Sequence, residues 1–411
     1  MTEIAARTFT TLWGELGTVG RDPHTGGYHR SVWSDADLEL REWFDHQAQQ
    51  RGLDLHVDGN GNQYAWWGDP TDGPAVLTGS HLDSVPDGGA YDGPLGVVAA
   101  FAAIDAMREQ GVRPARPVVV AAFADEEGAR FGVPCTGSRL LTGSLSPSDA
   151  LALRDRDGRQ LAEVLTRRGR DPQALGARPD LLRRIGCFVE LHVEQGRGLV
   201  DLDAAVGVAS MIWPHGRWRF DFRGRADHAG TTRMSDRADP MLTYAMTVLA
   251  ANKQARATDA RATFGRVSAT PGATNAVPSA VTGWLDARAG QDAELTALVE
   301  TITRQAAERA ERDGTSLEVT AESLTPSVHL DAALSGRLVE MLGDSGGVVP
   351  VLPTAAGHDA GVLSAAGVPT GMLFVRNPTG VSHSPAEHAE LDDCLAGVEA
   401  LVRVLTHLAH P

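Results

Sequence analysis

The sequence predicts an α/β protein: a domain built on a mostly parallel sheet, with an inserted ferredoxin-like α+β domain. Three observations lead to this prediction. Short apolar runs alternate with helix-like segments up to about residue 205. From about residue 208 the runs alternate apolar and polar residues, which is typical of antiparallel strands with one wet face. The first texture returns after residues 325–334, so the second domain is expected to interrupt the first.

Three segments of the first region, 74–85, 117–128 and 187–196, begin as apolar strands and end in polar residues. Between the first two lies an apolar helix, residues 93–111. A strand at 371–375 and a helix at 394–409 complete the pattern near the end of the chain. Alternation of strands and helices predicts parallel strands joined by crossover helices.

The inserted region starts with residues 217–224, where Trp218, Phe220 and Phe222 share one face. A helix at 239–255, strands at 262–270 and 276–289, a helix at 292–314 and a strand at 315–323 follow. The order β-α-β-β-α-β matches a ferredoxin-like unit. We therefore expect a catalytic domain in two parts, 1–207 and 327–411, around a domain at 208–326. A chain of 411 residues favours more than one core.

Composition and charge exclude several classes of partner. The formal net charge is −16, so nucleic acid and anionic membranes are not expected partners. Cys135, Cys187 and Cys394 form no CxxC pair, as expected for reduced thiols. No run approaches the roughly 18 to 20 apolar residues of a membrane helix, and the first residues do not resemble a signal peptide. These features predict a soluble cytoplasmic protein.

Polar residues gather where the predicted strands end, which is where open α/β sheets place functional groups. They are His81, Asp83, Asp125, Glu126, Glu127, Glu190, His192, Glu194, Gln195 and His383, with Asp92 just before the apolar helix. Each has a simpler explanation by itself: a lone histidine forms hydrogen bonds, Asp92 caps a helix, and paired acids form a solvated turn. Their convergence on one edge favours a functional site.

The chemistry of these side chains favours metal. Imidazole and carboxylate ligands suit zinc, and also manganese, cobalt or nickel. Two adjacent metals need a bridging carboxylate. Asp83 is placed to accept the second ring proton of His81. Glu126 and Glu127 are expected to point in opposite directions, so that one binds metal and the other takes a proton from water.

Six strings, "GSHLDSVPDGGAYDGPLGV", "DEEGARFG", "ELHVEQG", "HAGTT", "AGHDA" and "SHSPAEH", carry a family resemblance. Together they resemble the metal-dependent amidohydrolases related to di-zinc aminoacylases and exopeptidases. The most similar branch contains N-carbamoyl-L-amino-acid hydrolases, β-ureidopropionases and allantoate amidohydrolases. The resemblance runs in order from about residue 10 to the end of the chain.

The resemblance implies a role for each matching residue. It implies that two metal ions are bound by five residues: His81, Asp92, Glu127, His192 and His383. Asp92 would bridge the two ions. It implies that Glu126 is the general base and that His228 steadies the oxyanion from the partner subunit of a homodimer. The inserted domain would then be a lid and dimerisation domain. The residues implied to line the substrate are Gln195, Asn275, Arg288, Gly357 and His358, with Asn275 and Arg288 gripping its carboxylate.

Two segments depart from the family pattern. Arg233 stands where many relatives have proline, and Pro214 and His215 replace a small residue and a glutamine. Arg233 and His215 either alter the accepted substrate tail or are surface changes. Glu190 and Glu194 receive no role: they either support the ligands from behind or are solvated.

The expected reaction is hydrolysis of the ureido (carbamoyl) C–N bond of a small carboxylate, by a water that bridges the metals and is activated by Glu126. Allantoate and N-carbamoyl-L-amino acids are the favoured substrates, and β-ureido acids share the same groups. An N-acyl or N-formyl amino acid amidohydrolase and a di-metal exopeptidase are alternatives on the same scaffold. A non-enzymatic relative is disfavoured, because Glu126 stands beside a complete ligand set.

Overall fold

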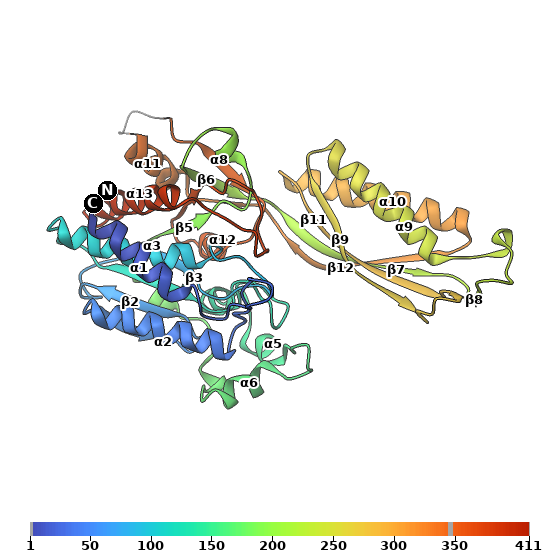
Figure 1. Cartoon of the computed structure of the whole chain (residues 1–411), viewed down its shortest axis with the longest axis horizontal. Helices are drawn as coiled ribbons and strands as arrows, with labels where there is room; N and C mark the ends of the chain where they lie inside the picture. Colours follow the sequence, from blue (N-terminus) through green and yellow to red (C-terminus); the bar gives the residue numbers. More distant parts are fainter. Residues whose placement is uncertain (1–2, 344–347, 411) are drawn as a thin grey trace. The chain divides into compact units, whose positions relative to one another are not determined.

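The computed structural model describes residues 3–343 and 348–410 of the chain (Figure 1). It forms two compact units, one of Met1–Met211 with His329–Pro411 and one of Ile212–Val328. In the part of the chain that the model describes, no helix is both long and apolar enough to span a membrane.

The first unit is built on a nine-stranded sheet with the order β1-β2-β4-β3-β5-β15-β6-β13, and β14 pairs with β6. Its four central strands are parallel: β4 (Val118–Phe123), β3 (Ala75–His81), β5 (Ile185–Val193) and β15 (Thr370–Val375). Nearly every residue of these strands is buried, as expected for strands covered on both faces. The predicted mostly parallel sheet is confirmed, and its strand ends meet at one edge.

Antiparallel strands extend this sheet on both sides. On one side β2 (Gln63–Trp67) pairs with β4, and β1 (Asp54–Val57) pairs with β2. On the other side β6 (Val206–Ile212) runs antiparallel to β15. The short strands β13 (Val328–His329) and β14 (Val351–Thr354) pair with β6.

Helices cover both faces of the sheet. Successive residues of a strand point to opposite faces, so each central strand contributes side chains to two cores. Val118 and Val120 face a core formed with α1 (Glu3–Leu16), α2 (Asp35–Gln50), α3 (Pro94–Glu109), α11 (Ala332–Gly343) and α13 (Leu391–Leu408). Val119 and Ala121 face a second core that includes α12 (Asp359–Ala365), α8 (Gly198–Asp201), Leu141 and Leu181.

Between β4 and β5 lies a group of short helices that the sequence pattern does not predict. They are α4 (Thr136–Thr142), α5 (Pro147–Ala152), α6 (Leu161–Arg167), η1 (Pro172–Ala174) and α7 (Pro179–Leu182). Leu140, Leu161 and Leu165 form a separate apolar cluster with Trp33 and Phe131. This cluster packs against the segment that follows β4.

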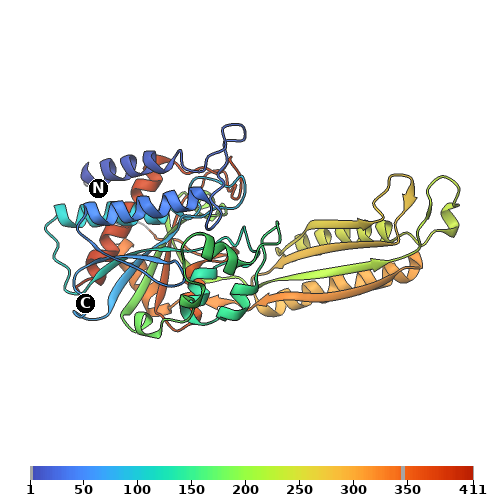
Figure 2. The ribbon, with the colours of Figure 1, turned by 90° about the horizontal axis from the view of Figure 1, so that it is seen from below.

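The second unit has a four-stranded sheet with the order β12-β7-β11-β9 and antiparallel pairs throughout. Its elements are β7 (His215–Arg223), α9 (Pro240–Ala257), β9 (Arg261–Thr270), β11 (Ala280–Arg288), α10 (Asp292–Asp313) and β12 (Ser316–Thr325). Both helices lie on one face of this sheet (Figure 2). Trp218, Phe220 and Phe222 are buried in a core that they share with these helices. The small pair β8 (Asp227–His228) and β10 (Ala276–Val277) and the turn η2 (Met234–Asp236) extend beyond one end.

Candidate metal centre

All five predicted metal ligands meet at the carboxyl edge of the first unit's sheet. His81 is the last residue of β3, His192 lies near the end of β5, and Asp92 lies two residues before α3. Glu127 and His383 follow β4 and β15. They form two groups whose potential ligand atoms lie within 4.8 Å of one another: His81 with Asp92 and His192, and Asp92 with Glu127 and His383.

Asp92 belongs to both groups, and each of its oxygens faces a different one. Asp92 Oδ1 lies 3.2 Å from His192 Nε2 and 3.6 Å from His81 Nε2. Asp92 Oδ2 lies 3.4 Å from His383 Nε2, which is 3.3 Å from Glu127 Oε2. This is the arrangement that a bridging carboxylate requires.

The two buried histidines fit divalent metal ions. The Nε2 atoms of His81 and His192 are buried and have no hydrogen-bond partner. A buried polar atom without a partner is costly, and a bound cation would satisfy it. His192 Nδ1 lies 2.9 Å from the carbonyl oxygen of Val193, and His81 Nδ1 lies 3.2 Å from that of Asp83. Nδ1–H donation to these carbonyls leaves the Nε2 lone pairs free for metal.

Asp83 forms hydrogen bonds with the loop after β4, besides its expected contact with His81. Its Oδ1 lies 3.5 Å from His81 Nδ1, farther than its own carbonyl oxygen. Its two carboxylate oxygens accept the backbone N–H groups of Glu126 and Glu127, at 3.2 and 3.1 Å. Asp83 therefore holds the loop that carries both glutamates.

Asp92 does not cap the helix that follows it. The N-cap of α3 is Gly93, which has a φ of 90° and no side chain to form a cap. A Cβ at Gly93 would lie 2.4 Å from the imidazole ring of His81. Glycine is needed at this position because the backbone passes so close to a ligand.

Glu126 is buried, Glu127 is half-buried, and the two face different histidines, so they do not form a solvated turn. Glu126 is 6% exposed, and its Oε2 lies 3.7 Å from His81 Nε2. Its Oε1 accepts a hydrogen bond from Cys135 Sγ at 3.4 Å. Glu127 instead faces His383. The expected division between the two glutamates agrees with this geometry.

Burial and close charges shift the pKa values of these groups in opposite directions. Burial raises the pKa of Glu126 well above its usual value, although His81 opposes this shift. Burial, followed by the charge of Asp92, raises the pKa of Glu127 to about 7. Burial alone would raise the pKa of Asp92, but the three histidines close to it outweigh burial and lower the pKa well below its usual value. Bound divalent cations would favour the deprotonated form of every ligand.

Glu387 lies within the string "SHSPAEH" and is not among the site residues predicted from the sequence. It is 5% exposed, and its Oε1 accepts the backbone N–H groups of Tyr91 and Asp92 at 2.8 and 3.0 Å. The hydroxyl of Ser382 donates to Asp92 Oδ2 at 3.0 Å and lies 3.3 Å from Glu387 Oε2. Glu387 thus fixes the backbone and, through Ser382, the carboxylate of the shared ligand. The sequence feature that could have identified Glu387 is its position four residues after the predicted ligand His383.

Two predicted substrate residues contact the ligands themselves. Gln195 Nε2 donates to Asp92 Oδ2 at 2.7 Å. His358 directly follows Gly357, is 3% exposed, and its ring centroid lies 4.5 Å from that of His192. The Nε2 atom of His358 is also buried without a hydrogen-bond partner, and burial keeps the pKa of this imidazole well below its usual value.

Glu190 and Glu194 support the site from behind, and neither is solvated. Glu190 is fully buried and accepts the hydroxyl of Ser80 at 2.6 Å and the backbone N–H of Ala360 at 3.0 Å. It therefore ties the first turn of α12, next to His358, to the strand of His192. Glu194 accepts the N–H groups of Gly198 and Leu199, at 2.6 and 2.9 Å, and so caps α8.

His228, Asn275 and Arg288 all lie in the second unit, but at two different ends of its sheet. His228 pairs with Ala276, and the N–H of Ala229 donates to the carbonyl oxygen of Asn275 at 3.0 Å. Arg288 lies at the other end of β11, opposite His215. The nine residues of β11, from Ala280 to Arg288, span about 27 Å. One small substrate cannot contact both ends within a single chain.

The two departures from the family pattern are separated in the same way. His215 starts β7 beside Arg288, whereas the exposed Arg233 precedes η2, close in sequence to His228. Each therefore lies near a different predicted substrate residue.

A mostly parallel α/β sheet with imidazoles and carboxylates clustered at its carboxyl edge defines a metal-dependent hydrolase. Residues 77–407 match the model of peptidase family M20/M25/M40, and the chain belongs to this family. The resemblance seen in the sequence is confirmed.

Relatives and solved structures narrow the branch of the family. The chain is 37% identical to an N-carbamoyl-L-amino acid amidohydrolase of Geobacillus stearothermophilus, over 96% of each chain. It is 32% identical to the allantoate amidohydrolase of Escherichia coli, again over 96% of each. A crystal structure of an amidase of the hydantoinase/carbamoylase family from Burkholderia vietnamiensis matches with a TM-score of 0.88 and 28% identity, covering 99% of this chain and 98% of the other.

Proposed function

We propose that the protein hydrolyses the ureido C–N bond of a small carboxylate such as allantoate or an N-carbamoyl-L-amino acid. The observation that carries this proposal is the buried carboxylate of Glu126 beside two ligand groups that share Asp92. Both relatives named above act on compounds with a ureido group and a carboxylate. The buried, unpaired cysteines agree with a cytoplasmic location.

The cofactor we propose is a pair of divalent ions, zinc foremost and manganese, cobalt or nickel as alternatives. His81, Asp92 and His192 would hold one ion, and Asp92, Glu127 and His383 the other. Such a pair, when bound, polarises a carbonyl group and lowers the pKa of water.

Glu126 is the proposed general base. Its Oε1 is occupied by the thiol of Cys135, so Oε2, on the side of His81, is the oxygen that takes a proton from the attacking water. The new C–O bond forms as that proton moves to Glu126. The same carboxyl group then returns the proton to the leaving nitrogen, and the C–N bond breaks.

His228 and Arg288 supply the remaining polar contacts with substrate. His228 Nδ1 accepts the backbone N–H groups of Gly230 and Thr231, at 3.0 and 3.2 Å. In the neutral ring the proton therefore sits on Nε2, which can donate to a developing oxyanion. The planar guanidinium of Arg288 suits both oxygens of a carboxylate.

We further propose that residues 208–326 form an inserted ferredoxin-like lid and dimerisation domain between catalytic segments 1–207 and 327–411. The roughly 27 Å between the two ends of its sheet supports a homodimer, since His228 and Asn275 of one chain could then meet Arg288 of the other. The edge strand β9 could pair antiparallel with its own copy about a twofold axis.

The surface next to β9 has the apolar character expected of an interface with a second copy of the chain. Leu242, Met246 and Leu249 of α9 are 46%, 39% and 65% exposed, and they follow one another at helical spacing. Val267 on β9 is 52% exposed. An apolar stripe beside an open strand edge is a suitable interface for an identical chain.

Mixing two inactive variants tests the shared site. His228→Ala and Arg288→Ala should each lose most activity, and their heterodimer should regain it, because one of its two sites then contains both residues. Each homodimer is the control. Failure to regain activity in a mixture shown to contain heterodimers would contradict action from the partner subunit.

The substrate class is tested by ammonia release over a panel of ureido acids, with zinc, manganese, cobalt and nickel supplied separately. N-carbamoyl-L-amino acids or allantoate should be hydrolysed fastest. N-formyl amino acids and dipeptides, followed by amino acid analysis, form the comparison set. Faster hydrolysis of dipeptides than of every ureido acid would replace the proposal with the exopeptidase alternative.

A further inference from the structure

A cavity lined almost entirely by arginine lies in the first unit, apart from the metal centre. It has a volume of about 250 Å³ and is lined by Arg130, Arg159, Val164, Arg167 and Arg168. We name it the arginine pocket. The segment 154–170 has six arginines against three acids, a net charge of +3 in a chain whose net charge is −16. The pocket is therefore a local concentration of positive charge in an acidic protein.

Most of that charge is not neutralised by buried acids. Arg130 pairs with the half-buried Asp155, whose side chain is 7% exposed. Arg168 and Arg159 pair with carboxylates that are 94% and 68% exposed, and such exposed pairs contribute little. An anion in the pocket could therefore displace the exposed carboxylates from Arg159 and Arg168 at little cost.

The protein holds two of these arginines in place from behind. Arg130 Nη1 donates to the carbonyl oxygen of Val32 at 3.0 Å, and Arg168 Nε donates to that of Trp33, also at 3.0 Å. Val164, which is 3% exposed, gives the pocket an apolar lining between them. Groups fixed before binding lose less entropy when the ligand arrives.

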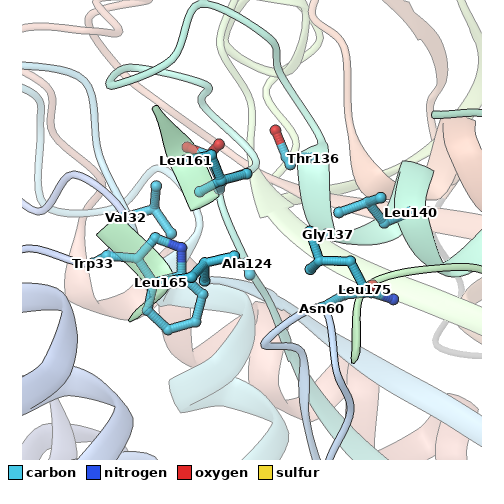
Figure 3. Close-up of a pocket in the computed structure, with 11 residues that line it drawn as sticks. Val32, Trp33, Asn60, Ala124, Thr136, Gly137, Leu140, Leu161, Leu165 and Leu175 are labelled. Carbon is cyan, nitrogen blue, oxygen red and sulfur yellow. The ribbon is translucent and has the colours of Figure 1, made fainter. Parts of the chain in front are cut away.

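The arginine pocket differs in volume and in lining from a second cavity, which is also lined by residues of α6. A cavity lined by Trp33, Ala124, Thr136, Leu161 and Leu165 has a volume of only about 10 Å³ (Figure 3). That is room for about one water molecule, so it cannot hold a substrate. Leu161 and Leu165 of α6 line this small cavity, whereas Val164 and Arg167 of the same helix line the arginine pocket.

The volume and the charge of the arginine pocket together favour a phosphate group over a carboxylate. Four guanidinium groups around a small volume can donate to more oxygens than the two that a carboxylate offers, and a phosphate group has three or four. The volume is below that of usual drug-sized sites. We propose that the arginine pocket binds a phosphate group, either as inorganic phosphate or as the head of a small phosphomonoester.

The location connects this site to the catalytic loop. Arg130 lies three residues after Glu127, in the segment that Asp83 holds through its backbone. A ligand on Arg130 is therefore expected to stabilise the loop of the general base as well as α6.

Calorimetric titration of the metal-loaded full chain with inorganic phosphate tests the site. One saturable event per chain is expected, and the double variant Arg159→Gln/Arg167→Gln should weaken it at least about tenfold. The matched control, Arg154→Gln/Arg156→Gln, removes the same charge from exposed residues of the same segment outside the pocket, and should change the affinity by less than about twofold. Circular dichroism spectra of both variants should match that of the wild type, which checks that they are folded.

Further titrations identify the kind of phosphate and exclude a general charge effect. Glycerol phosphate binding as tightly as inorganic phosphate would identify a phosphomonoester head as an accepted ligand, whereas preference for inorganic phosphate would identify the free ion. Three results would overturn the proposal: acetate binding as tightly as phosphate, equal weakening in both double variants, or affinity unchanged in Arg159→Gln/Arg167→Gln, which would place the bound phosphate elsewhere.

Discussion

Glu387 is expected to control metal affinity although it is not a ligand. Its Oε1 accepts the backbone N–H groups of Tyr91 and Asp92, and its Oε2 faces the hydroxyl of Ser382, which donates to Asp92. The substitution Glu387→Gln keeps the shape of the side chain and removes its charge. It therefore tests whether the charge holds the shared ligand in position.

The expected size of the effect follows from these hydrogen bonds. Hydrogen bonds to a charged group contribute about 1.5–3 kcal/mol, against about 0.5–1.5 kcal/mol for neutral ones. Removing the charge should cost about 1–1.5 kcal/mol, which corresponds to roughly a tenfold loss of metal affinity. That value lies at the lower end of the 10- to 100-fold range usual for partners that orient metal ligands.

Competition with a chelator of known affinity measures this loss directly. Glu390→Gln is the matched control, because Glu390 is an exposed acid three residues away. Its affinity for both ions should equal that of the wild type. Unchanged affinity for both ions in Glu387→Gln would refute the positioning role of Glu387.

Three further predictions follow from the same geometry. Gly89→Ala places a Cβ 2.3 Å from Glu387 Oε1, so it should lower metal content at least as much as Glu387→Gln, whereas Gly336→Ala, which meets no atom within 4 Å, should not. Glu194→Ala removes the cap of α8 and should lower the unfolding free energy by about 1–2 kcal/mol in denaturant titrations; a loss below about 0.5 kcal/mol would contradict the capping role. Chelation of the metals should lower the thermal midpoint, and re-addition of zinc should restore it; an unchanged midpoint would mean that metal does not stabilise the fold.

The parallel sheet and the ligand positions could be predicted because both depend on local patterns. Buried strands read as short apolar runs, and the polar residues after them must meet at one edge. These patterns predict that His81, Glu127 and His192 lie together, and the structure groups them around Asp92 with His383.

Other features depend on contacts between distant segments, which a sequence pattern does not reveal. Glu387 contacts Asp92 across 295 positions, and Glu190 contacts Ala360 across 170. The helices between β4 and β5 are short and carry no long hydrophobic period, so their elements were not predicted. The arginines of that region are spread from Arg130 to Arg168, and only the fold brings them around one pocket.

The distance between His228 and Arg288 depends on strand register in the same way. Both were expected at one substrate through the family resemblance. The pairing of β7 with β11 places Arg288 opposite His215, about 27 Å of strand away from the end that carries His228. The register of the sheet is therefore what makes a second chain necessary in the proposal.

The most direct test of the proposed function is to measure metal content and turnover together in Glu126→Gln. Because Glu126 is the proposed base and not a ligand, the variant should bind two metal ions per chain, as the wild type does. Its hydrolysis of the best ureido acid should fall by at least about a hundredfold, the lower end of what general base catalysis contributes. Turnover near that of the wild type, with both metals bound, would contradict the account.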